Sequence, residues 1–68
     1  MPKIDLTTEG LEFFEKDDVP FAWEPKSMNL FRVLSDNQLE SRSPKLFADL
    51  FQKGRAIDKS EALRLASS

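Results

Sequence analysis

The sequence predicts a mainly α-helical fold, a single small domain with three or four short helices. Two helix-start signals in its C-terminal part lead to this prediction. Ser43 precedes Pro44, and Ser caps free N–H groups while Pro suits the first helical turn. Asp58 has Glu61 three residues later, which is the spacing of a capping box. We therefore expect a C-terminal αα-hairpin over residues 43–68, which would form one wall of the core.

The first helix of this hairpin is expected to end near Lys53. Its apolar residues have the spacing of one helical face, with members at i, i+1, i+4 and i+5. They are Leu46, Phe47, Leu50 and Phe51. Gly54 follows where a left-handed C-terminal cap belongs. Residues 55–57 would be a short loop, and the second helix would run from Asp58 towards the C-terminus.

The N-terminal half begins with Lys3–Leu6, whose polar–apolar alternation suits a very short strand. Thr7 or Thr8 can then cap a short helix that runs from about Thr8 to Lys16. From Val19 to Lys26 two prolines favour an extended or turn-like backbone, which is unusual for a stretch that carries Phe21 and Trp23.

Residues 28–34 permit either a strand or a helix, and we favour the helix, with Ser27 as its cap. Ser35 and Gln38 have the spacing of another capping box, so a short helix could begin there. The structural alternative is an α+β fold in which a short two-stranded ribbon pairs residues 3–6 with residues 29–34.

Composition limits the chemistry. The chain of 68 residues contains neither Cys nor His and only two Gly. A nucleophile–His pair, a thiolate metal site and a glycine-rich phosphate loop therefore cannot be assembled from it. We expect no enzyme activity, no cofactor and no metal site. Residues 1–68 should form one domain, and without an apolar signal segment a cytoplasmic location is expected.

Charge and aromatic residues are concentrated in residues 9–24. Six acidic residues and one basic residue give this segment a net charge of −5, and it holds four of the seven aromatic residues. Residues 25–68 carry a net charge of +3, and the basic residues continue through the predicted helical segment 43–68. This polarity favours a non-enzymatic protein–protein interaction module: an adaptor, an inhibitor or an assembly subunit.

The predicted binding residues lie in the turn and the proline-bracketed stretch of that segment. Phe21 and Trp23 would be aromatic anchors, while Asp17, Asp18 and Glu24 would select a basic rim on the partner. The partner would be a protein with a basic apolar groove, and we expect no membrane contact. Because the core is small, we also expect homodimers. The competing interpretation is that the rings simply form the core.

A second function follows from a resemblance. The run from Gly54 to Ala66 resembles the turn and second-helix start of ribbon-helix-helix repressors and antitoxins, and residues 38–42 would be the family's ribbon. In that family the ribbon pairs across a dimer and lies in the DNA major groove. The resemblance implies a small DNA-binding regulator that contacts nucleic acid through Gln38, Arg42 and Arg55, with Glu40 also facing the DNA.

Overall fold

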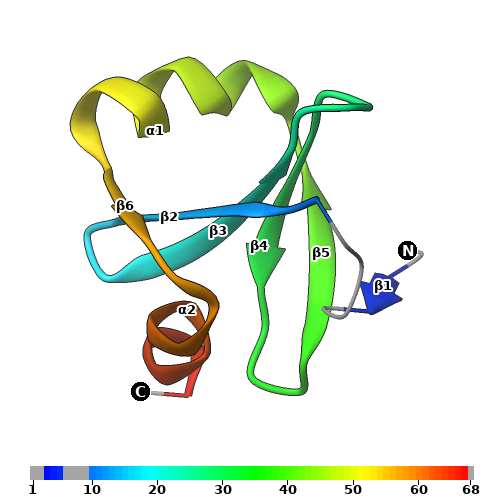
Figure 1. Ribbon diagram of the computed structural model, residues 1–68, viewed down its shortest axis with the longest axis vertical. Coiled ribbons are helices and arrows are strands. Elements are labelled where there is room, and N and C mark those ends of the chain that lie inside the picture. The colour runs from blue at the N-terminus through cyan, green and yellow to red at the C-terminus, as the bar shows by residue number, and fades with distance from the viewer. Residues whose placement is uncertain (1–2, 6–9, 68) are drawn as a thin grey trace.

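The computed structural model describes residues 3–5 and 10–67 and shows a six-stranded antiparallel sheet with one helix on each face (Figure 1). The mainly α-helical prediction is therefore wrong. The elements are β1 (Lys3–Asp5), β2 (Glu12–Lys16), β3 (Val19–Glu24), β4 (Asn29–Val33), β5 (Gln38–Arg42), the 3-10 turn η1 (Pro44–Leu46), α1 (Phe47–Lys53), β6 (Arg55–Ile57) and α2 (Lys59–Ala66).

The strand order is β1-β5-β4-β3-β2-β6. Strands β2 to β5 form an up-and-down meander, and β6 returns to pair with β2. The short N-terminal strand is confirmed over Lys3–Asp5, but it pairs with β5. The ribbon between residues 3–6 and 29–34 is therefore also wrong, because β4 lies one strand further into the sheet.

Strands replace two predicted helices. The helix expected from Thr8 to Lys16 is instead β2 over its described second half, and the helix favoured at residues 28–34 is β4. Both segments contain adjacent apolar residues, Phe13-Phe14 and Leu30-Phe31. Successive side chains of a strand point to opposite faces, so in a sheet covered on both sides both members of each pair pack against a covered face: Phe14, Leu30 and Phe31 are buried and Phe13 is partly buried. Tertiary packing has overridden the helical spacing.

The extended backbone predicted for residues 19–26 is confirmed over β3, and Pro20 is compatible with it. Pairing between β3 and β4 begins at Phe21 and Arg32. Pro20 lies just outside that ladder, where its missing N–H leaves no gap in the hydrogen bonding.

Short polar turns connect the strands. Asp17 and Asp18 form the β2–β3 turn, and both have positive φ (54° and 64°), as type I′ hairpin turns require. The predicted helix start at Ser35 is a turn instead, in which Asp36 Oδ1 accepts a hydrogen bond from the Gln38 backbone N–H at 3.2 Å and Asn37 has φ 63°.

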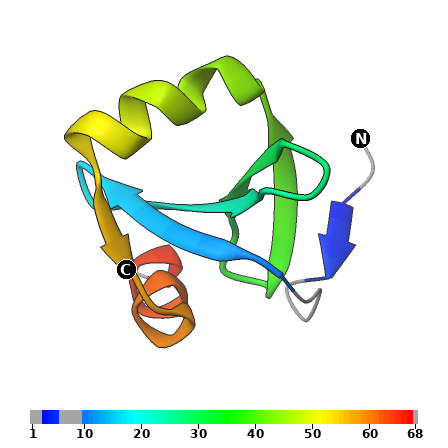
Figure 2. The same cartoon turned by 45° about the horizontal axis from the view of Figure 1, so that its top comes forward.

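The C-terminal helix starts are confirmed. Ser43 Oγ accepts from the Lys45 N–H, and Asp58 Oδ1 accepts from the Glu61 N–H at 2.8 Å. The αα-hairpin is wrong, because the predicted loop at residues 55–57 is β6, and α1 and α2 lie on opposite faces of the sheet (Figure 2).

Gly54 ends α1 without the predicted left-handed conformation, since its φ is −86°. A Cβ atom at this position would lie 2.5 Å from the Leu50 carbonyl oxygen and 2.7 Å from the Glu15 carbonyl oxygen. The glycine is needed for this close approach of α1 to the β2 backbone.

The two faces of the sheet carry separate apolar clusters. The α2 face is mostly aliphatic, and its buried members are Ala22, Phe31, Val33, Leu39 and Ala62. The α1 face is mostly aromatic, with Phe14, Trp23, Leu30 and Leu50 buried and Phe21 and Phe47 packed against them.

Candidate functional site

Four aromatic rings on the α1 face are connected through ring contacts with Phe47, and we call them the ring cluster. Phe47 is at its centre: its ring stacks on Trp23 with centroids 3.9 Å apart, meets Phe14 edge-on at 5.7 Å, and lies 5.9 Å from Phe51. Trp23 is only 7 % exposed, whereas Phe51 is 68 % exposed. The cluster therefore begins in the core and ends at the surface.

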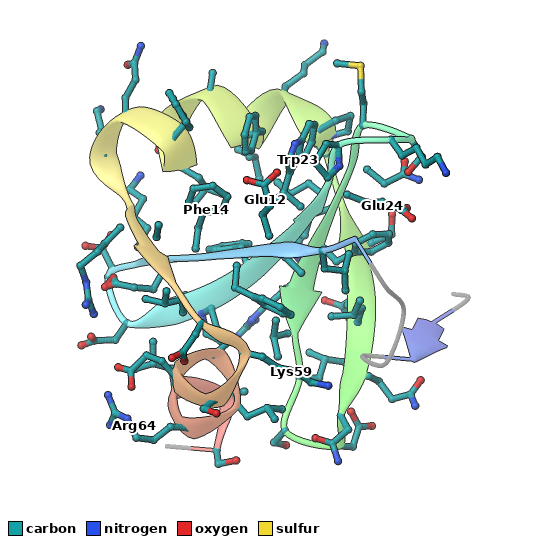
Figure 3. The ribbon with its side chains drawn as sticks, viewed as in Figure 1. Glu12, Phe14, Trp23, Glu24, Lys59 and Arg64 are labelled. Carbon is teal, nitrogen blue, oxygen red and sulfur yellow. The ribbon has the colours of Figure 1, made fainter. Side chains whose placement is uncertain are left out.

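Strand register explains why these rings meet. Glu12 is opposite Trp23 on the neighbouring strand, and Phe14 is opposite Phe21. These two cross-strand pairs therefore lie on the α1 face, which brings Phe14 and Trp23 under the rings of α1. Figure 3 shows Glu12, Phe14 and Trp23 beneath α1. Glu12 is exposed, which places an acidic side chain beside the ring cluster.

The other flank of α1 covers a cavity of about 270 Å³, which we call the α1 cavity. Its apolar lining is Val19, Phe21, Leu46 and Leu50, and its polar lining is Lys16, Asp17 and Asp49. Asp49 and Phe51 are two residues apart, so they point about 200° apart around the helix. The cavity and the exposed Phe51 ring are therefore on different flanks of one helix.

An ion pair closes one side of the α1 cavity. Lys16 Nζ donates a hydrogen bond to Asp49 Oδ2, and Lys53 Nζ lies 3.4 Å from Asp49 Oδ1. The hydrogen bond from Lys16 lowers the pKa of Asp49 below its ordinary value, and the bond to Asp49 raises the pKa of Lys16. Both side chains are therefore charged at neutral pH.

The five predicted partner-binding residues are not brought to one place. Phe21 and Asp17 line the α1 cavity, but Asp18 lines a different cavity of about 620 Å³ that also involves the C-terminal end of α2. Trp23 lies in the core, where a partner cannot reach it. Glu24 is at the far end of β3 and accepts a hydrogen bond from Ser27 Oγ.

The residues of the DNA-binding alternative are separated as well. Gln38 and Arg42 share one face of β5 with Glu40, as the resemblance implied, but β5 is paired on both edges by β1 and β4. It cannot form the family's ribbon across a dimer while that pairing lasts. Arg55 lies on β6 at the opposite edge of the sheet, where it pairs with Glu15 at 3.2 Å.

Sequence reasoning missed Phe51 and Leu46 as surface residues, because it placed both in a core-facing helical stripe. The width of the stripe was the available signal. Positions i, i+1, i+4 and i+5 cover about 140° around a helix, more than the roughly 100° that a helix on one layer needs to bury. Leu46 is 46 % exposed and Phe51 is 68 % exposed, so the outer members of the stripe remain outside the core.

Comparisons with known proteins identify no family for this chain. No protein-family model matches it, and no curated protein or solved structure shows significant similarity. Within the part of the chain that the structure describes, no group of three acidic side chains is arranged to hold a metal ion. None of the described helices has the length and apolar character needed to cross a membrane.

Proposed function

We propose that this chain is a non-enzymatic protein–protein interaction module that binds its partner through the ring cluster, with Phe51 as the aromatic anchor. The observation that carries the proposal is the exposure of the Phe51 ring. A chain this small has few large apolar side chains for its core, and yet it leaves one aromatic ring 68 % exposed while the ring beside it is packed.

The packing of Phe51 suits the role of an anchor. Trp23 stacks on Phe47, and Phe47 in turn contacts Phe51, so the exposed ring is supported from the core. An aromatic side chain that is already held loses little conformational entropy on binding. Trp23, which the sequence suggested as an anchor, is instead the support for one.

Charge gives the surface a preference among partners. Glu12 beside the ring cluster favours a groove that is apolar at its centre and basic at its rim. An adaptor, an inhibitor and an assembly subunit would all use such a contact. The cytoplasmic location remains a prediction. The DNA-binding alternative has less support, because β5 is paired on both edges and supplies no free ribbon.

Affinity capture from extract of the native host, followed by mass spectrometry, tests the proposal. Phe51→Ser should lose the captured partner and keep the circular dichroism spectrum of the parent chain. Met28→Ser is the matched control, because Met28 is 65 % exposed but lies in the β3–β4 turn. Equal capture by the parent chain and Phe51→Ser would remove Phe51 as the anchor.

A further inference from the structure

We infer that the α1 cavity is the site that receives Phe51 from a second copy of this chain, so that two copies associate through their α1 faces. The inference rests on the proposed function, since it takes Phe51 as an anchor and names its partner. It also gives a role to the α1 cavity, which the proposed function leaves unused.

The α1 cavity is large enough to receive one large side chain. Its volume of about 270 Å³ is just below the roughly 300–1,000 Å³ of typical small-molecule sites. Val19, Phe21, Leu46 and Leu50 give it an apolar lining that a phenyl ring can contact on several sides. Leu46 is 46 % exposed and would be covered by the entering ring.

One exposed charge near each feature can form a contact between two copies. Glu12 lies beside the ring cluster, and Lys53 lies beside the α1 cavity, whose own charged lining of Lys16, Asp17 and Asp49 is balanced by this second lysine. The Lys53 side chain is 69 % exposed, and an ammonium group has three donors, so its bond to Asp49 leaves donors for another carboxylate. When Phe51 of one copy enters the cavity of the other, Glu12 can approach this lysine.

Symmetry favours a second copy over an unrelated groove. In a two-fold dimer each contact occurs twice, so a ring on one flank of α1 and a cavity on the other flank can both be filled at once. The same arrangement removes two exposed apolar surfaces from water, which a chain with a small core can use for stability.

Sedimentation equilibrium with two complementary variants tests the inference. Phe51→Ser removes the ring and keeps the α1 cavity, while Val19→Phe fills the cavity and keeps the ring. Each variant alone should raise the dimer dissociation constant by roughly thirty-fold, the range of a binding hot spot. A mixture of the two should form a heterodimer, because Phe51 of the Val19→Phe chain can still enter the intact cavity of the other chain.

Met28→Ser should dimerise like the parent chain and serves as the control. Leu46→Asp is a second cavity variant, at a position that is already half exposed, in case Val19→Phe alters the fold. A parent chain that stays monomeric at every attainable concentration would overturn the inference and leave the capture experiment as the separate test of the proposed function. Dimers that persist in both single variants, or a mixture that fails to associate, would also overturn it.

Discussion

The two faces of the sheet are covered by helices of similar length, seven residues in α1 and eight in α2, but the two helices pack on the sheet differently. On the α2 face, Ala22 and Ala62 are both fully buried, and small side chains let the helix lie close to the sheet. On the α1 face, stacked aromatic rings separate the helix from the sheet, and the layer is left with a cavity on one flank and an exposed ring on the other.

The difference shows that side-chain size decides which face of this small sheet exposes large apolar side chains. Among the described residues, the exposed large apolar side chains are Met28, Leu46 and Phe51, and none of them lies on α2. Around Ala22 and Ala62 the α2 face is closely packed, and its cavity of about 620 Å³ lies at the C-terminal end of α2. On the α1 face the bulky rings leave a cavity beside the helix and one ring protruding. The proposed binding surface is therefore the face that exposes Phe51 and Leu46.

The largest effect should come from removing Trp23, a buried ring of the ring cluster. Trp23→Ala deletes a buried ring that stacks on Phe47, and the expected loss in free energy of unfolding is about 3–5 kcal/mol. This is enough to unfold many small domains. Urea unfolding followed by circular dichroism measures it, with Trp23→Phe as a milder control. A Trp23→Ala chain as stable as its parent would mean that the α1 face is not part of the core.

The second prediction concerns the close contact between the C-terminal end of α1 and the β2 backbone, which Gly54→Ala should weaken. Gly54→Ala places a methyl group against the backbone oxygens of Leu50 and Glu15, and overpacking of this kind costs about 1–3 kcal/mol. We expect a cost near the upper part of that range, because neither oxygen belongs to a flexible side chain. Thermal unfolding is a suitable measurement. An unchanged midpoint would show that α1 can move away from β2 freely.

A matched pair of enlargements compares the two faces directly. Ala62→Val adds volume at a fully buried position on the α2 face, and it should cost about 1 kcal/mol or more. Val19→Leu adds volume beside the α1 cavity and should change stability by less than about 0.5 kcal/mol. Equal costs in urea unfolding would contradict the difference in packing between the faces.

The smallest effect concerns the ion pair at the wall of the α1 cavity. Because the Asp49 pKa lies below its ordinary value of 3.8 in the folded chain, the carboxylate adds stability above that pH and the contribution is lost as the pH falls through the folded pKa. Lys16 has a pKa raised above 10.5, so its contribution is lost only as the pH rises through that raised value.

The Asp49→Asn variant should therefore be slightly less stable than its parent at neutral pH, and the difference should disappear in acid. Chemical unfolding of the two chains at both pH values measures it. A difference that stays the same below the Asp49 pKa would show that the ion pair is not its source.

Local signals in the sequence predicted part of this structure. Ser43 and Asp58 marked the beginnings of helical segments because capping is a short-range interaction, and the two prolines marked the extended β3 stretch. Strands β2 and β4 were not predictable in this way. Their adjacent apolar residues fit a helical face locally, and only long-range pairing in a sheet that is covered on both sides makes them strands.

The candidate site was predicted less well than these elements. The acidic-aromatic segment does supply Glu12, Trp23, Phe21 and Asp17 to the α1 face. The exposed ring, however, comes from a helix more than twenty residues further along the chain. The width of the apolar stripe indicates that its outer members lie outside the core, but no local pattern indicates that Phe47 covers Trp23.

Nuclear magnetic resonance of the ¹⁵N-labelled chain over a range of protein concentrations tests the central claim most directly. We predict that the amide signals of Phe51, Leu46, Val19 and Phe21 shift together as the concentration rises, while those of α2 stay in place. Shifts confined to α2, or spectra that do not depend on concentration, would contradict association through the α1 face.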